Sequence, residues 1–268
     1  MRIFIFLFIL TFTLFAKERI ISLSPSITEI LFALGHGEEV VGTSAFSLHP
    51  AKAQEIAIIG GASNPNIEKI ISLKPTIVFG QSYNHEILKK LQFFDIKTSS
   101  IKLKTINDIK NSISTVANLL NSDASKLIYE IDKALENGDK NQNPHSVMIV
   151  YGLHEDLRRA IYIAGKDIFF DDIIMACGNT NAYTSTLTTQ PVLNYENIIA
   201  INPDQIIILH AHATGANTDV EKALQEWYKI PTNASKHKRI SVIDEDYLHI
   251  PSHRVAFTIK RLCKEMSY

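Results

Sequence analysis

The feature that most constrains this fold is a short module that occurs twice, about half a chain length apart. The stretch NIEKIISLKPTIVFG begins at Asn66, and NYENIIAINPDQIII begins 128 residues later, at Asn194. Each copy has an Asn, a Glu two residues on, isoleucines at helical spacing, a Pro and an apolar run. An Asn can cap a helix, and a Pro disfavours helix in the residue before it. Each copy therefore predicts a short helix, a stop and a buried strand.

Strands and helices alternate around both copies. In the first half we expect strands at residues 19–23, 40–44, 76–80 and 96–101, with helices at 85–94 and 106–120. In the second half we expect strands in SVMIVYG, IYIAG, 205–209 and 239–243, with helices at 169–176 and from 252 onward. This alternation predicts parallel sheets with crossover helices. One module per half predicts an α/β fold of two similar lobes related by a pseudo-twofold.

The first helix is expected in the stretch SPSITEILFALGHG. Ser26 is in position to cap this helix, and Glu29 three residues later is in position for the reciprocal capping-box bond. Gly35 or Gly37 is expected to end the helix.

Residues 122–142 differ from both halves. They contain no strand pattern, and Leu127, Ile128, Ile131 and Leu135 make one narrow apolar stripe. We therefore expect a linker helix over 122–142, between an N-terminal lobe of residues 17–121 and a C-terminal lobe of residues 143–268. Ligands of open α/β sheets bind beyond the carboxyl ends of the strands, so two facing lobes predict a ligand cleft between them.

The N-terminus has the pattern of an export signal. One Arg precedes thirteen apolar or Thr residues, from Ile3 to Phe15, and Ala16 follows. A helix of that length reaches about 20 Å, short of the roughly 30 Å core of a bilayer. We expect residues 1–16 to be a signal peptide cleaved near Ala16, with a periplasmic mature protein. A membrane anchor is the alternative.

Charge and motifs narrow the class of function. The formal net charge is −1, which argues against nucleic acid as a partner because no basic stripe is present. We find no G-x-S-x-G elbow, no H-E-x-x-H pair and no Walker loop, so we expect no enzyme activity. An exported α/β hydrolase remains the alternative from that class.

The chain has two cysteines, Cys177 and Cys263. In an exported protein an even pair suggests a disulfide, and two buried thiols are the alternative.

Several stretches together resemble the periplasmic binding proteins of ABC importers for iron chelates and cobalamin. They are RIISLSPSITEILFALG, the two E-x-I-I-x-x-x-P modules, the central segment and WYKIPTNASKHKRISVID. The resemblance implies two α/β lobes joined by one long helix, with the ligand between them. It implies delivery of a metal chelate (an iron siderophore, haem or a cobalamin-type ligand) to a permease dimer in the inner membrane. We expect a monomer that carries this chelate as cargo and uses no cofactor.

The same resemblance assigns roles to particular residues. The docking glutamates of the family, which pair with permease arginines, fall on Glu68 and Glu196. Taken alone, each acid is also explained by the favourable interaction of a carboxylate with a helix N-terminus. The stretches MACGNTNAY and KRLCKEM resemble the sites of a disulfide in the cobalamin-binding branch, which implies that Cys177 pairs with Cys263.

Candidate ligand residues follow the expected strand ends: Ser24, Phe46, Tyr83, Tyr151, His210 and His212. The tyrosines could stack on a flat ligand or be ordinary half-buried side chains. His210 and His212 share one face if the strand continues, and imidazole suits nickel, copper, zinc, iron or haem. Surface loop histidines are the alternative there.

Arg158 and Arg159 could bind an anionic chelate, or they could form a solvated loop. A third possible function is direct binding of a nickel-type metal ion through the two histidines.

Overall fold

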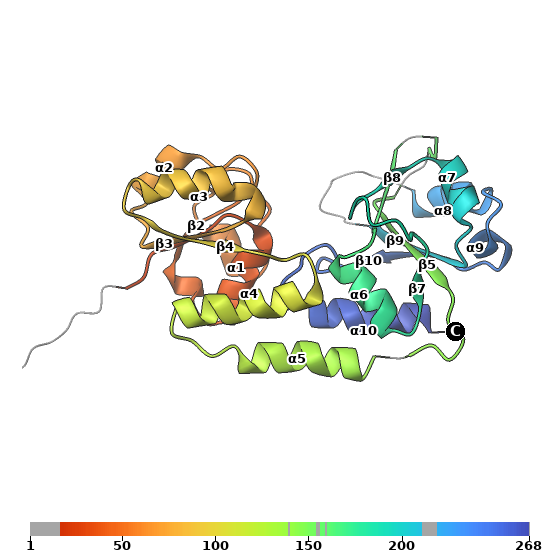
Figure 1. The fold of residues 1–268 in the computed structure, drawn as a ribbon. Coiled ribbons are helices and arrows are strands. Elements are labelled where there is room, and N and C mark those ends of the chain that lie inside the picture. Colours follow the sequence, from red (N-terminus) through yellow and green to blue (C-terminus); the bar gives the residue numbers. More distant parts are fainter. Residues whose placement is uncertain (1–16, 139, 154–155, 159, 211–218, 268) are drawn as a thin grey trace, which may run out of the picture.

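The computed structural model describes residues 17–138, 140–153, 156–158, 160–210 and 219–267. These residues form two sheets that carry helices, and the two α/β lobes stand side by side on a base of helices (Figure 1). The expected signal peptide, residues 1–16, lies outside the described residues, as do Arg159 and His212. Within the described ranges, no helix combines the length and hydropathy needed to cross a membrane.

The N-terminal lobe is built on a four-stranded sheet in the order β2-β1-β3-β4, and all its pairings are parallel. Ile20, Val78 and Phe79 are buried in the two central strands, as expected for a parallel sheet covered on both faces. The elements are β1 (Ile20–Ser22), α1 (Pro25–Ala33), η1 (Gly37–Glu39), β2 (Val40–Thr43), η2 (Ala51–Glu55), α2 (Ile67–Ser72), β3 (Ile77–Gln81), η3 (Ser82–Asn84), α3 (His85–Gln92), β4 (Lys97–Ile101) and α4 (Ile106–Leu119).

The C-terminal lobe is built on a six-stranded sheet. The strands β10, β9 and β5 are parallel neighbours, and β7 also pairs in parallel with β5. β6 and β8 are antiparallel, which the sequence pattern did not distinguish. The elements are β5 (Ser146–Tyr151), β6 (Ile161–Ile163), α6 (Phe169–Ala176), β7 (Thr180–Asn181), β8 (Val192–Leu193), α7 (Tyr195–Ile201), β9 (Gln205–His210), α8 (Val220–Tyr228), α9 (Asn233–Lys236), β10 (Ile240–Asp244) and α10 (Val255–Met266).

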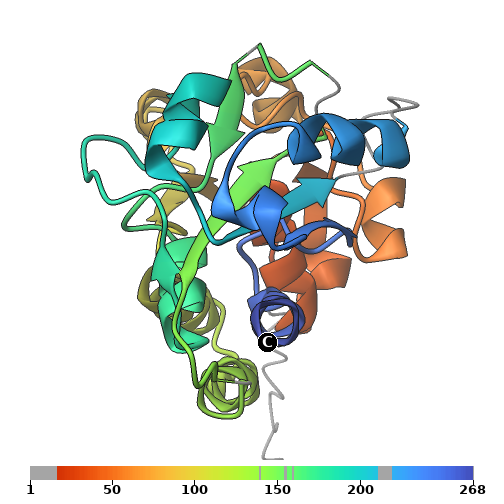
Figure 2. The same cartoon turned by 90° about the vertical axis from the view of Figure 1, so that its right-hand side faces the viewer.

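Helix α5 (Ser125–Glu136) joins the two halves at the base of the molecule. Figure 2 shows α5 and α10 nearly end on below the C-terminal sheet, so both run along the line between the lobes. The expected apolar stripe packs inward, with Ile131 fully buried and Leu127, Ile128 and Leu135 partly buried. The helix is shorter than the 122–142 expected, and lobe boundaries at 121 and 143 remain a prediction.

One hydrophobic core runs through both halves of the chain. It includes one isoleucine from each of α1, α4, α5, α6 and α10: Ile27, Ile109, Ile131, Ile173 and Ile259. The lobes therefore share one packed core at their base and are not connected by a linker alone.

The repeated module folds in the same way in both lobes. Asn66 caps α2 by accepting a hydrogen bond from the Lys69 amide at 2.8 Å, and Asn194 caps α7 in the equivalent way, at 2.9 Å from the Asn197 amide. Before each Pro the chain turns left-handed, with φ of +49° at Lys74 and +51° at Asn202. The predicted helix stop is thus confirmed in both copies.

The predicted capping box of the first helix is wrong. The N-cap of α1 is Ser24, whose side chain accepts from the Ile27 amide at 3.3 Å, and Pro25 is the first helical residue. Ser26 lies within the helix, and Glu29 is buried instead of capping. Gly35 follows the helix with φ of +89°, which confirms the expected end.

Cys177 and Cys263 form a disulfide with an S–S distance of 2.03 Å. It joins the end of α6 to α10, and both half-cystines are buried. The expected pairing is confirmed.

Candidate functional site

The carboxyl ends of the strands in both lobes lie toward the boundary between the lobes. After β4, the Lys104 carbonyl accepts a hydrogen bond from the Phe169 amide of α6 at 2.7 Å. After β10, Arg254 reaches Glu29 of α1. Both contacts join an N-terminal element to a C-terminal one. Because these crossing segments follow strand carboxyl ends, each sheet presents those ends to the other lobe, where open α/β sheets bind ligands.

Phe46 is the most exposed candidate of the N-terminal lobe. Its side chain is 74% exposed, on the loop that follows β2. Its φ of +66° is unusual for a bulky residue, and such backbone outliers occur preferentially at functional sites. The Ala45 amide donates to the Gly60 carbonyl at 2.8 Å, and the Leu48 amide donates to the Phe46 carbonyl at 2.9 Å. The loop is therefore held in a shape that keeps a large apolar side chain in solvent.

Tyr83 is the second aromatic candidate of this lobe. It follows β3 in the short helix η3, and its side chain is 54% exposed. Partial burial raises the pKa of its hydroxyl, so Tyr83 is neutral and can donate a hydrogen bond at physiological pH.

Tyr151 and His210 are the last residues of β5 and β9 in the C-terminal lobe. The Tyr151 ring lies 5.8 Å from Phe170 and 5.9 Å from His249, measured between ring centroids. Burial raises the pKa of the Tyr151 hydroxyl. Burial, and then the nearby His210, lower the pKa of His249. Tyr151 and His249 are therefore neutral at physiological pH and only partly buried, which suits contact with a flat conjugated ligand.

Two further predicted ligand residues have local partners. Ser24 is 1% exposed and its hydroxyl caps α1, so it is not available for direct ligand contact in this structure. The Arg158 guanidinium pairs with Asp156 at 2.9 Å. Arg158 also lines a groove of about 470 Å³ with Tyr195 and Ile199, which places it beside α7.

Glu68 and Glu196 lie where the repeated module predicts. Each is exposed in the first turn of its helix, α2 or α7. Among the described residues neither carboxylate has an ion-pair partner. Figures 1 and 2 show α2 and α7 on opposite lobes, at the side of the molecule away from α5. The two acids are therefore separate and available to one partner that spans both lobes.

A metal-ion site made by protein side chains alone has no support here. Within the described ranges, no three His, Cys, Asp or Glu side chains lie together as metal ligands. His210 is only 7% exposed, and its predicted partner His212 lies outside the described residues.

Sequence reasoning missed the role of Glu29. Its carboxylate is buried against Arg254, 225 residues later in the chain. The available signal was a Glu in the otherwise apolar stretch ITEILFA, because a carboxylate on a buried helix face needs a cationic partner.

The fold and the site together define a two-lobed binding protein. Aromatic candidates from both lobes lie at strand carboxyl ends, and matching acidic helices lie on the two lobes. Residues 20–247 match the model of a family described as periplasmic binding protein, and the chain belongs to this family.

Individual relatives agree with this assignment. A vitamin B12-binding protein from Pectobacterium atrosepticum is 24% identical, over 93% of this chain and 88% of the relative. The periplasmic heme-binding protein RhuT from Roseiflexus sp. RS-1, solved in apo form, is 26% identical with a TM-score of 0.75, over 93% of this chain and 98% of that one. The vitamin B12-binding protein BtuF of Vibrio cholerae has the same fold, with 23% identity and a TM-score of 0.75, over 93% and 96% of the two chains.

Proposed function

We propose that this protein is a periplasmic receptor that binds a metal chelate between its lobes and delivers it to an ABC permease. The observation that carries this proposal is the matched pair of docking helices. Glu68 and Glu196 are exposed at equivalent positions on opposite lobes, on one side of the molecule. A twofold permease would offer two equivalent cationic sites to such a pair.

The ligand is a chelate with a flat conjugated ring, such as haem or a corrin. Phe46 and Tyr83 supply exposed aromatic surface from the N-terminal lobe, and Tyr151 supplies a ring from the C-terminal lobe. Aromatic faces stack favourably on conjugated rings. The vitamin B12-binding and heme-binding relatives support this class of ligand.

The chelated metal is cargo and takes no part in bond chemistry. The imidazole of His210, at the end of β9, is of a type that can contact such a metal. Export by the segment 1–16, a monomeric state and docking to a permease dimer belong to the same proposal.

A spectroscopic titration tests the ligand class. The mature protein is mixed with haemin, cyanocobalamin, a ferric siderophore and nickel–histidine, and absorption changes are followed. We expect saturable one-site binding of haemin or cyanocobalamin, and binding of the ferric siderophore alone would contradict a flat conjugated ligand. Binding of free nickel without a chelator, with no binding of the chelates, would instead favour a metal-ion receptor.

A matched pair of variants tests the stacking role. Phe46→Ala should weaken binding of that chelate about tenfold, the change expected for loss of one aromatic contact worth about 1–1.5 kcal/mol. Phe93→Ala is the control, because Phe93 is similarly exposed but follows α3, away from the β2 end. Equal affinities for the two variants would remove Phe46 from the site.

A further inference from the structure

The segment between β10 and α10 carries ligand-side residues of the C-terminal lobe. It contains Tyr247 and His249, and the His249 ring lies 5.9 Å from Tyr151 at the end of β5. This loop therefore borders the strand ends where the proposed ligand binds. Its position relative to the N-terminal lobe affects how the two halves of the site meet.

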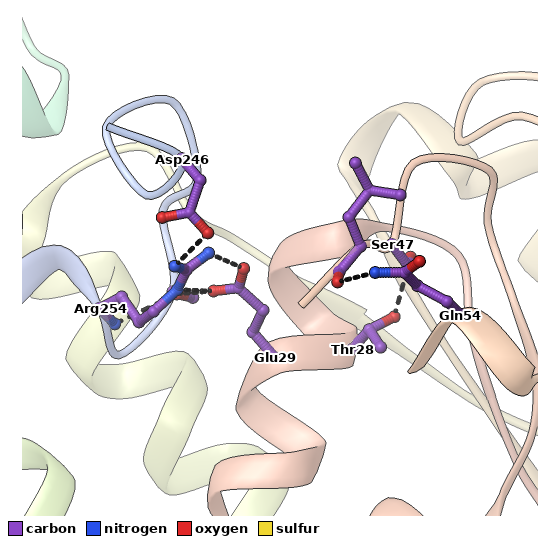
Figure 3. Close-up of polar contacts among 8 residues, drawn as sticks. Thr28, Glu29, Ser47, Gln54, Asp246 and Arg254 are labelled. Atoms are coloured by element: carbon purple, nitrogen blue, oxygen red, sulfur yellow. Dashed lines mark hydrogen bonds and ion pairs between the residues drawn. The ribbon is translucent and has the colours of Figure 1, made fainter. Parts of the chain in front are cut away.

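One guanidinium connects this loop to the other lobe. Arg254 donates from Nε to Glu29 Oε2 at 3.0 Å and from Nη2 to Glu29 Oε1 at 2.5 Å, a two-pronged contact (Figure 3). Its Nη1 donates to Asp246 Oδ2 at 2.8 Å. Ser252 adds a bond from its hydroxyl to Glu29 Oε2 at 2.5 Å. Glu29 thus receives its partners from the start of α10, and Arg254 also holds the loop at Asp246.

The contact is buried at the boundary between the lobes. The side chains of Glu29 and Arg254 are 3% and 6% exposed, whereas Asp246 is 68% exposed. If one partner of a buried pair is lost while the other stays buried, the remaining charge is uncompensated and destabilises the structure. Separating the lobes at this point would leave both charges unpaired, so the pair resists such a movement.

We propose that Glu29 and Arg254 are positioning residues that fix the loop between β10 and α10 against α1 and so preset the spacing of the two lobes. Their relevance to ligand binding depends on the proposed function. The preset spacing itself is a property of the ligand-free protein. We call the Glu29–Arg254 pair the anchor, and Asp246 connects it to the exposed part of the loop.

A partly buried ion pair within one lobe provides the control. Lys166 Nζ donates to Asp171 Oδ1 at 2.8 Å, and Asp171 is buried. Both residues lie in the C-terminal lobe, next to α6. Lys166→Met removes an ion pair whose two residues lie in the same lobe, so it breaks no ion pair between the lobes.

The first test measures the distance between the lobes without any ligand. Spin labels are placed on cysteines introduced at exposed Glu86 and Lys236, one per lobe, with the native disulfide intact. Pulsed electron–electron double resonance then gives the distribution of distances between the two labels for the parent protein, Glu29→Gln and Lys166→Met. We expect a broader or shifted distribution for Glu29→Gln alone. Unchanged distributions in all three proteins would overturn the proposal.

Arg254→Lys serves if Glu29→Gln does not fold. It keeps the positive charge but loses the two-pronged geometry. The same broadening is expected, and an unchanged distribution in this variant counts equally against the anchor.

The second test measures dissociation of haemin or cyanocobalamin, whichever the parent binds. Glu29→Gln should release it about tenfold faster, since interface changes act mainly on dissociation, and Lys166→Met should leave the rate unchanged. Equal rates in the three proteins would contradict the positioning role. If the parent binds neither probe, the proposed ligand class fails, while the distance measurement still decides whether the anchor exists.

Discussion

Single residues at the lobe boundary form buried polar contacts that their local sequence does not indicate. Glu29 sits in an apolar helix, and its carboxylate accepts bonds from both Arg254 and Ser252. Removing one partner of a buried pair leaves an uncompensated charge, which is the most destabilising way to change it.

Glu29→Ala should therefore lower the free energy of unfolding by about 3–5 kcal/mol, as measured by urea denaturation. The double change Glu29→Met with Arg254→Met should lower it much less, because no charge is left buried. A double variant as unstable as the single one would show that packing, and not the charge, dominates at this site.

His253 makes stability depend on pH. Burial, followed by the charges of Arg254 and His49, lowers the pKa of His253 from 6.5 to about 4. Between these values the unfolded chain binds a proton that the folded chain does not, so stability falls as the pH drops through this window. The full effect is at most about 3 kcal/mol.

His253→Gln should flatten the loss of stability between pH 6.5 and pH 4. The test is thermal or urea unfolding of both proteins at several pH values. Identical slopes would assign the acid sensitivity to other groups, such as His249, whose pKa burial also lowers.

At the scale of elements, the repeated module is defined by its left-handed residue as well as its acid. Lys74 and Asn202 occupy the same position before Pro75 and Pro203, both with positive φ. Asn tolerates this conformation better than Lys does, and here Asn202 Oδ1 also accepts a hydrogen bond from the Asn233 amide at 2.8 Å.

Lys74→Gly should accordingly raise the free energy of unfolding by up to about 1 kcal/mol, whereas Asn202→Gly should lower it, because it removes the bond that Asn202 Oδ1 accepts from the Asn233 amide. Chemical denaturation of the two variants measures the difference. The reverse order would mean that backbone strain at Lys74 is relieved by contacts that the lysine side chain makes.

Most elements could be predicted from the sequence where local signals agree. Helix α6 has the predicted limits because its apolar pattern begins at Phe169 and Gly178 follows with φ of +78°. Strand β6 was predicted, but its antiparallel direction was not, because periodicity carries no information about direction. Helix α8 was missed, since its N-cap Asp219 and sparse buried face of Ala223 and Trp227 give a weak apolar pattern.

The candidate site was less predictable than the fold. Phe46, Tyr83, Tyr151 and His210 could be placed near strand ends from the sequence, because that rule depends only on local sequence, and their contact with a ligand stays a prediction. Ser24 was predicted by the same rule and Arg158 by its charge, but both have local partners, a helix amide and Asp156. Contacts between distant segments, such as Glu29 with Arg254, cannot be obtained from local spacing.

At the scale of the whole molecule, the shared core and the disulfide make the base a single packed unit. Helices α4, α5 and α10 pack along the line between the lobes, and Ile109, Ile131 and Ile259 belong to one core. Helices α2 and α7, each with an exposed Glu in its first turn, lie on the two lobes at the side away from this base. The proposed delivery to a permease depends on Glu68 and Glu196 acting together on one partner.

The most direct test is binding of the ligand-loaded protein to its ABC permease in nanodiscs. Glu68→Ala with Glu196→Ala should abolish the complex and leave chelate affinity unchanged. Glu86→Ala with Glu221→Ala is the control, because each of these exposed acids also lies in the first turn of a helix, one per lobe. Permease binding retained by the first pair, or lost equally in both, would contradict the account.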